Sequence, residues 1–239
     1  MVGLRDNAKR RYVAEMFTRI APRYDLMNGL MTGGMHHRWR REAAAAATRG
    51  VGGAALDVAT GTGDLALALA RRPEVSRVVG VDLLPEMVAL ARAKARNGHT
   101  GSAVSFAVAD GPSLPFPSGV FACAATAWGL RNMPDPREAL AEMVRVVKPG
   151  GMVVSLDSFA VEGTPWSRGF RLFFHHVVPL MGQVFAGDRA AYTYLPRSVD
   201  GFLSAEELEV LMAEAGLAEV GHRKAGLGAV GLHWGKVPG

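Results

Sequence analysis

Cysteine is almost absent from this chain, whose 239 residues contain only Cys123. An internal disulfide is therefore excluded, and a reducing compartment is favoured. Because no histidine lies near it in the run "VFACAAT", we expect Cys123 to be a buried, inert thiol and not a nucleophile.

Uncharged segments suited to crossing a membrane are also missing. The longest uncharged run, Gly111–Leu130, contains three prolines and two internal glycines, so it cannot form a spanning helix. The opening residues, "MVGLRDNAKRRYVAEMF", carry charges throughout and do not resemble a secretory signal. We therefore expect a cytoplasmic protein, with peripheral contact at the inner face of the membrane left open.

Acidic residues are outnumbered, and the net charge is +5. This balance permits an anionic membrane surface or a nucleic acid as partner but selects neither. The basic clusters "KRR" (Lys9–Arg11) and "HHRWRR" (His36–Arg41) are the candidate contact points, with a merely solvated basic face as the alternative.

Strand and helix patterns alternate from about residue 54 onward. Expected strands cover 54–58, 77–81, 103–108, 120–127 and 152–156, and expected helices cover 64–71, 85–96 and 135–147. This order predicts an α/β, Rossmann-like fold with a mostly parallel sheet and helices on both faces. A helix at 205–215 and strands at 217–224 and 227–234 predict a closing C-terminal hairpin. We expect one domain over 1–239, with a helical N-terminal segment (1–50) and a helical cap at about 160–200.

A glycine turn follows the first expected strand in "ALDVATGTGDLALALA" (Ala55–Ala70). Gly61, Gly63 and Ala66 fit the loose nucleotide-binding pattern G-x-G-x-x-G/A. Asp82 ends the next strand, where a carboxylate can accept hydrogen bonds from ribose hydroxyls. These residues alone suit NAD and S-adenosylmethionine (SAM) equally well.

Two aspartates that bracket the glycines favour SAM. Asp57 ends the strand, and Asp64 begins the following helix. A pyrophosphate placed against them would be repelled, whereas the ammonium and sulfonium of SAM would be attracted. Asp110 ends a third strand and could accept from the adenine amino group, although an Asp-Gly turn is the alternative. The sequence therefore predicts SAM and disfavours NAD.

Several longer stretches resemble the ubiquinone/menaquinone biosynthesis C-methyltransferases, and more closely the demethylmenaquinone methyltransferase branch. The glycine motif and "KPGG" occur in SAM methyltransferases generally, while "RYDLMN", "GLRN" and "YTYLPRSV" are more specific; the resemblance runs from about Met16 to Lys236. It implies methyl transfer from SAM to a ring carbon of a polyprenylated quinol. Demethylmenaquinol is the expected acceptor, with a benzoquinol or another small molecule as the alternative.

The resemblance also implies positions for the cofactor. Family contacts with SAM map onto Thr62, Asp82, Asp110, Gly111 and Ala127, and Ala127 is often serine in the family. The usual "EFS" after the "KPGG" strand is "DSF" here (Asp157–Phe159). The predicted cofactor-binding residues are Asp57, Gly61, Thr62, Gly63, Asp82, Leu83, Asp110, Gly111 and Ala127.

A more electron-rich ring is what the transfer needs, so the protein must align the ring and polarise a quinol hydroxyl. The candidates are Arg131, Asn132, Tyr24 and His176, with Asp25 and His175 beside the last two. An arginine can stabilise a phenolate but is a poor proton acceptor, so His176 or a water is the better base. The alternatives are a salt bridge of Arg131 with a helix acid and simple packing of the histidine pair.

Other classes fit less well. A nucleic-acid N-methyltransferase would carry an Asn/Asp-Pro-Pro-aromatic motif, which "TAWGLRNMPD" lacks, and clustered ligands for a metal-dependent O-methyltransferase are not evident. A non-enzymatic SAM-binding module would not need an intact "GLRN". No metal and no nucleic acid are therefore expected, and a homodimer is left open. Residues Trp166–Phe185 form either a buried core helix or a cap that touches lipid.

Overall fold

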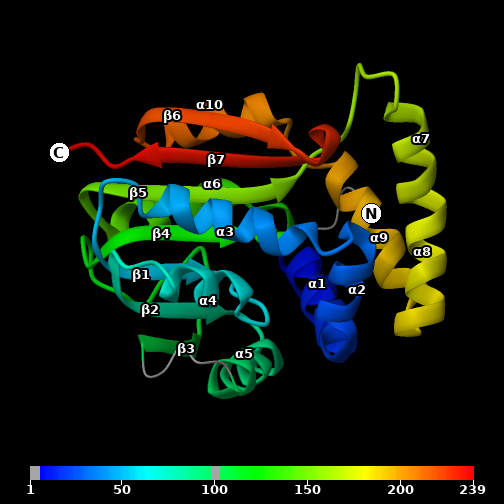
Figure 1. Ribbon diagram of the computed structural model, residues 1–239, viewed down its shortest axis with the longest axis horizontal. Helices are drawn as coiled ribbons and strands as arrows, with labels where there is room; N and C mark the ends of the chain where they lie inside the picture. Colours follow the sequence, from blue (N-terminus) through cyan, green and yellow to red (C-terminus); the bar gives the residue numbers. More distant parts are fainter. Residues whose placement is uncertain (1–5, 98–102) are drawn as a thin grey trace.

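A seven-stranded sheet organises the residues that the computed structural model describes, 6–97 and 103–239 (Figure 1). The strand order is β3-β2-β1-β4-β5-β7-β6, and the first five strands are parallel neighbours, whereas β7 is antiparallel to β5 and β6. The predicted fold class and closing hairpin are thereby confirmed. The strands are β1 (Gly53–Val58), β2 (Val75–Asp82), β3 (Val104–Val108), β4 (Phe121–Ala127), β5 (Val147–Ser158), β6 (Ala218–Ala225) and β7 (Val230–Lys236).

Helices cover both faces of this sheet. One hydrophobic cluster packs α3 (Met35–Ala47), α4 (Asp64–Ala70) and α5 (Pro85–Asn97) on one face. A second packs α6 (Pro136–Val146) and α10 (Ala205–Glu214) on the other. Because both faces are buried, the central strands are nearly continuous apolar runs.

Strand β5 is longer than the sequence predicted. Its pairing with β4 jumps from Phe121–Val147 to Cys123–Met152, so the "KPGG" residues bulge out between two paired segments. Gly150 has a φ of +76°, and a Cβ on Gly151 would collide with the Ala122 carbonyl. Glycine at both positions therefore permits the bulge.

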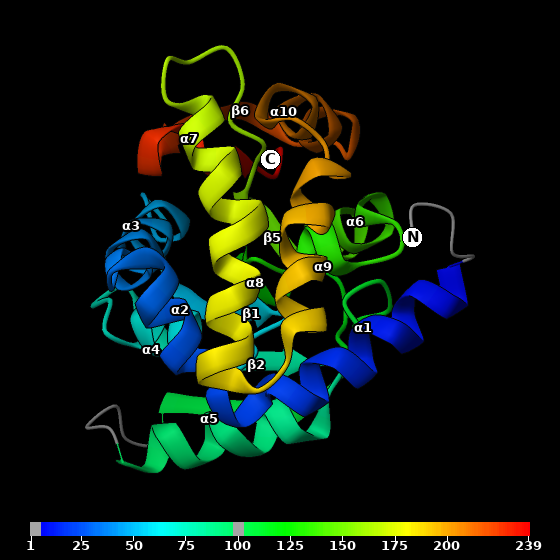
Figure 2. The same ribbon diagram turned by 90° about the vertical axis from the view of Figure 1, so that its right-hand side faces the viewer.

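The remaining helices gather at the end of the sheet toward which the parallel strands point (Figures 1 and 2). They are α1 (Asp6–Ile20), α2 (Tyr24–Thr32), α7 (Ser167–Leu172), α8 (Val178–Met181) and α9 (Arg189–Asp200). Helices α7 and α8 are joined through a π-helical turn, Phe173–Val177, so 167–181 is one helical rod. We call this rod together with α9 the cap.

The N-terminal helices and the cap share a third hydrophobic cluster, made of Met16, Ile20, Met27, Val178, Ala191 and Tyr192. Segments about 150 residues apart in the sequence are thus held together over the carboxyl ends of the strands. Within the described residues, no helix has the length and apolar character needed to cross a membrane.

Gly182 allows the cap rod to approach α9 closely, because a Cβ there would collide with the Tyr192 ring. We expect Gly182→Ala to lower the free energy of unfolding by about 1–3 kcal/mol through overpacking. Gly169 lies in α7 with open space around its Cβ position, so Gly169→Ala should instead stabilise by about 0.5–1 kcal/mol. Denaturant unfolding of both variants measures this difference, and equal shifts would contradict the packing argument.

Candidate active site

Two neighbouring cavities open where the parallel strands end. The small cavity, about 120 Å³, lies between the ends of β1, β2 and β4 and helix α1. The large cavity, about 490 Å³, lies between α1–α3 and the cap. The two cavities share the lining residues Phe17, Tyr24, Trp128 and Asn132. The two cavities therefore adjoin at these four side chains.

Asp82 fixes the glycine loop against the small cavity. Its carboxylate accepts hydrogen bonds from the Gly61 N–H (2.8 Å) and the Leu84 N–H (3.0 Å). Burial raises the pKa of Asp82, while the hydrogen bonds from backbone N–H groups act in the opposite direction. Gly61 has a φ of +55°, the left-handed conformation that glycine adopts without strain. The predicted residues that line this cavity are Gly61, Asp82, Leu83, Asp110, Gly111 and Ala127.

Helix α1 closes the outer side of the small cavity, which the sequence did not predict. Arg10 forms an ion pair with Asp110 at 2.7 Å, and Val13, Ala14 and Phe17 line the cavity beside it. The cluster "KRR" is therefore more than a solvated face, since Arg10 binds a predicted site residue.

Three predicted cofactor residues lie behind the loop and do not line the small cavity. Asp57 is buried and accepts a hydrogen bond from the Thr60 hydroxyl (2.6 Å), and burial raises its pKa to about 7. The Thr62 hydroxyl donates to Asp25 (2.6 Å), and a Cβ on Gly63 would press on Phe106. The side chains of Asp57 and Thr62 thus support the loop, and the cofactor contacts of Asp57, Thr62 and Gly63 stay predictions.

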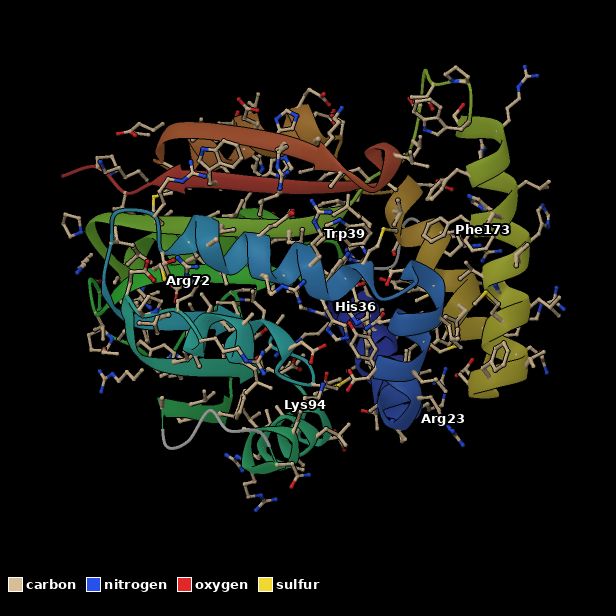
Figure 3. The ribbon with its side chains drawn as sticks, in the orientation of Figure 1. Arg23, His36, Trp39, Arg72, Lys94 and Phe173 are labelled. Atoms are coloured by element: carbon tan, nitrogen blue, oxygen red, sulfur yellow. The ribbon has the colours of Figure 1, made fainter. Side chains whose placement is uncertain are left out.

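Asp64 does not face the ligand space as the sequence argument assumed. It pairs with Arg40 of α3 (3.1 Å) and Lys94 of α5 (2.8 Å), the latter labelled in Figure 3. Burial would raise the pKa of Asp64, but Arg40 and Lys94 outweigh it and lower the pKa. Because its charge is compensated, Asp64 gives no repulsion against a pyrophosphate.

A possible metal-ligand group exists among the described residues. His36, His37 and Asp64 each place one potential ligand atom within 4.8 Å of the others. Arg40 and Lys94 already pair with Asp64, and these cations would repel a metal ion. We assign no metal to this group.

Arg131 lies at the wall of the large cavity. Its Nη1 is 2.5 Å from Oδ1 of Asp157, which is completely buried at the end of β5, and 3.3 Å from the Trp128 carbonyl. Its Nε is buried and has no hydrogen-bond partner within the described part of the chain. The salt bridge considered for Arg131 exists, but its partner is a strand acid. The guanidinium is thus held at the cavity wall by Asp157 and by the Trp128 carbonyl.

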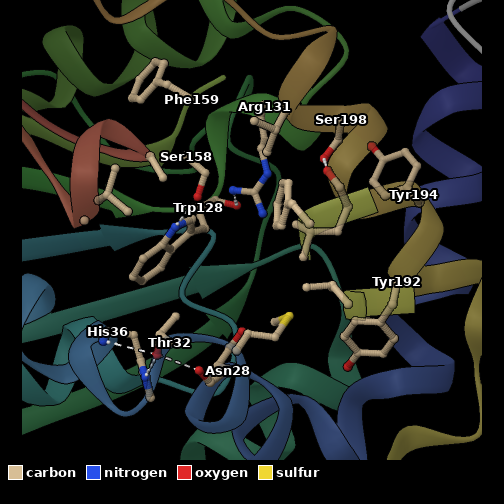
Figure 4. A pocket seen from close by; sticks show the side chains of 18 of the residues that line it. Asn28, Thr32, His36, Trp128, Arg131, Ser158, Phe159, Tyr192, Tyr194 and Ser198 are labelled. Carbon is tan, nitrogen blue, oxygen red and sulfur yellow. Dashed lines mark hydrogen bonds between the residues drawn. The ribbon is translucent and has the colours of Figure 1, made fainter. Parts of the chain in front are cut away.

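Hydrogen bonds connect the polar groups around Arg131, which lies beside Trp128 and Ser158 (Figure 4). Asn132 donates to the Trp128 carbonyl (2.9 Å), and the Tyr194 hydroxyl donates to Asn132 (3.4 Å). Trp128 has a φ of +59°, an unusual conformation for a large side chain, and its indole N–H donates to Ser158 (3.0 Å). Non-glycine residues in this conformation cluster at functional sites.

Tyr24 begins α2 and lines both cavities. A Cβ on Gly61 would lie 3.9 Å from its ring, so Tyr24 is beside the glycine loop. Of the predicted catalytic candidates, Tyr24, Arg131 and Asn132 are thus brought together.

His176 is not part of this group. It is exposed on the cap rod and lines neither cavity, while His175 is 3.2 Å from Asp200. The helical turn directs both side chains away from the cavity, so we withdraw His176 as the proton acceptor.

A different histidine, His36, lines the large cavity. The sequence analysis placed it in a basic cluster and missed it. The available signal was helical spacing, because the buried residues of α3, at 36, 39, 40, 43, 44, 46 and 47, recur every three to four positions.

The described fold is that of SAM-dependent methyltransferases. The structure of such an enzyme from Thermotoga maritima, described as a possible histamine N-methyltransferase, matches with a TM-score of 0.63 at 19% identity over 94% of this chain and 99% of that chain. A SAM-dependent methyltransferase from Aquifex aeolicus matches with a TM-score of 0.55 at 19% identity over 77% of this chain and 81% of that one. At these identities the likeness concerns the fold.

Sequence comparison is more specific. Residues 5–237 match the ubiE/COQ5 methyltransferase family. The chain is 42% identical to the demethylmenaquinone methyltransferase of Thermus thermophilus over 93% of this chain and 100% of the relative. It is 39% identical to the ubiquinone/menaquinone biosynthesis C-methyltransferase UbiE of Geobacter sulfurreducens over 95% and 89%. The chain therefore belongs to the ubiE/COQ5 methyltransferase family, whose methyl donor is SAM.

We expect a substitution in the small cavity to change SAM affinity and a substitution in the large cavity to change turnover. Asp82→Asn replaces one oxygen of the carboxylate that we expect to accept from the ribose by a donor, and we expect SAM affinity to fall by about 1–3 kcal/mol. Arg131→Lys keeps a cation beside Asp157 and should leave SAM affinity unchanged while lowering kcat. Calorimetry with SAM and steady-state kinetics measure both. Wild-type affinity in the first variant, or equal losses of affinity and kcat in the second, would reverse these assignments.

Proposed function

We propose that this enzyme methylates a ring carbon of a polyprenylated naphthoquinol, converting demethylmenaquinol to menaquinol. The observation that carries the proposal is the large, mostly apolar cavity rich in aromatic side chains, which has Arg131 at its wall and adjoins the small cavity across Tyr24, Trp128 and Asn132. The names of the relatives from Thermus and Geobacter support the quinol class.

In the small cavity, Asp82 is the candidate acceptor for ribose hydroxyls and Asp110 for the adenine amino group. SAM, when bound, supplies an activated methyl group. Leu83, Gly111 and Ala127 provide the apolar and backbone surroundings.

In the large cavity, Arg131 is our candidate for activating the acceptor ring. The ring carbon must form the new carbon–carbon bond while the sulfur–methyl bond breaks, and the ring then loses its proton. A phenolate oxygen next to the guanidinium raises the electron density of the ring, and Arg131 stabilises that negative charge. Arg131 stays charged, so the proton passes to another acceptor, and a water is our candidate.

Tyr24 and Asn132 position the ring at the junction of the cavities, since both line each of them. The aromatic side chains of Trp39, Trp128, Phe170, Phe173 and Phe174 surround the space beyond. Such walls suit a flat bicyclic ring and the first units of a prenyl tail. This apolar breadth is our reason for preferring a naphthoquinol to a benzoquinol.

An anaerobic assay with purified enzyme and SAM tests the proposal. We expect methylation of a short-chain 2-prenyl-1,4-naphthoquinol, detected as the methylated ring by mass spectrometry. The matching benzoquinol should react more slowly. The unreduced naphthoquinone should not react, because two carbonyls withdraw electron density from the attacking carbon. Faster benzoquinol turnover would overturn the head-group assignment, and equal rates with and without prereduction would overturn the mechanism.

We further propose that the cap contacts the membrane in which the prenyl tail resides. The inner side of the cap rod bears Phe170, Phe174 and Val178, which line the large cavity. Val177 and Leu180 line neither cavity and are 41% and 55% exposed, and Val184 in the turn that continues the rod (Gly182–Ala186) is 66% exposed. The two alternatives considered for 166–185 thus describe opposite sides of one helix. Exposed Arg168 and Arg171 at its start are suited to anionic headgroups.

Liposome flotation with anionic lipid at low salt tests this contact. We expect the double variant Leu180→Glu and Val184→Glu to lower the bound fraction at least about tenfold, since burying each side chain in lipid is worth on the order of 1.5–3 kcal/mol. Val210 is similarly exposed (58%) but lies on α10, so Val210→Glu is the matched control and should bind like the wild type. Equal binding by all three proteins would contradict the contact.

A further inference from the structure

His36 is a buried polar group in the large cavity that the mechanism above does not use. Its residue is 2% exposed, and it lines the cavity together with Asn28 and Thr32 of α2 (Figure 4). Arg131 and Asn132 line the same cavity and form a separate polar group.

The hydrogen bonds of Thr32 fix the tautomer of His36. The Thr32 hydroxyl donates its proton to the Asn28 carbonyl at 2.7 Å. Its oxygen is also 2.8 Å from Nδ1 of His36. Because the hydroxyl has one proton, Nδ1–H must be the donor in this second contact. Nε2 of the neutral ring is then an acceptor only.

The ring is also held in its neutral form. Burial, Arg40 and His37 lower the pKa of His36 to about 4, and the opposing effects of Asp64 and Asp25 are smaller. At neutral pH the side chain therefore cannot donate from Nε2.

An acceptor-only group distinguishes the two redox states of a quinone ring. The quinol presents O–H donors, whereas the quinone presents carbonyl oxygens that only accept. Arg131 donates and can bind an oxygen of either form, so it does not by itself exclude the quinone. We propose that Nε2 of His36 accepts a hydrogen bond from a quinol hydroxyl and thereby selects the reduced acceptor. This inference rests on the proposed function and assigns His36 a specificity role.

Binding without turnover provides the test. The enzyme is saturated with S-adenosylhomocysteine, and anaerobic calorimetry compares a short-chain 2-prenyl-1,4-naphthoquinol with its quinone. We expect the wild type to bind the quinol about tenfold more tightly than the quinone. In the quinol complex Nε2 accepts one hydrogen bond, whereas in the quinone complex its lone pair faces a lone pair of the carbonyl oxygen. His36→Gln offers both a donor and an acceptor, so it should bind both rings with a ratio near one. His37→Gln changes the exposed neighbour and should keep the wild-type ratio.

Thr32→Val gives a second, nearly isosteric variant. Without the threonine oxygen, the Nε2–H tautomer of His36 becomes accessible. The preference for the quinol over the quinone should therefore fall. The ¹⁵N shifts of His36 should report Nδ1–H in the wild type and a mixture in Thr32→Val. A purely structural role of His36 would leave the ratio of quinol to quinone affinity unchanged while the tautomer shifts.

Three results would overturn the inference: equal affinities in the wild type, an unchanged ratio in His36→Gln, or an Nε2–H tautomer in the wild type. The tautomer measurement on the wild type tests the inference even if a variant does not fold. If the enzyme methylates the naphthoquinol but His36→Gln leaves the ratio of quinol to quinone affinity unchanged, this inference alone is wrong. A wild type that neither binds nor methylates the naphthoquinol would remove the proposed function with it.

Discussion

The buried ion pair between Arg131 and Asp157 is the interaction on which the site depends. Removing two charges from water costs several kcal/mol per ion, so each requires the other, and loss of one partner typically destabilises by about 3–5 kcal/mol. Asp157 also accepts from the backbone N–H of Ser158 in its own strand (2.8 Å) and from the backbone N–H of Arg131 (3.4 Å). The contacts with Arg131 tie the end of β5 to the turn that follows β4. The same guanidinium contacts the Trp128 carbonyl, so the strained Trp128 backbone is held between the two cavities.

A second constraint is the network of charges behind the glycine loop. Lys94 of α5 pairs with Asp64 and with Asp25 of α2, and it also donates to the Thr62 hydroxyl. Arg40 joins the network from α3 and lies over the Trp128 ring, 4.7 Å from its centre. The network connects α2 and α3 to α4, α5 and the glycine loop. Together with the hydrophobic cluster shared by α1, α2 and the cap, it encloses the large cavity without any covalent link.

Much of the architecture and part of the site could be predicted from local patterns. Alternating strands and helices required a parallel sheet, and carboxylates at strand ends had to meet along one edge, as Asp82 and Asp110 do. The same reasoning failed for Asp57 and Asp64. The end of a strand gives the position of a side chain along the edge of the sheet. Its partners from other elements decide the direction in which the carboxylate points. Thr60 holds Asp57, and Arg40 and Lys94 hold Asp64.

The sequence by itself determined the sheet, the glycine loop, the family and the "GLRN" turn, because periodicity and short motifs are local properties of the chain. Tertiary structure alone decided which histidine enters the large cavity. His36 and His176 both lie in apolar-rich helices, yet packing of α3 against the sheet buries the first, and the outer surface of the cap exposes the second. It also decided that Arg10 closes the small cavity and that Asp157 neutralises Arg131. These pairings join residues 26 and 100 positions apart, and no local pattern specifies which distant charge a buried group will require.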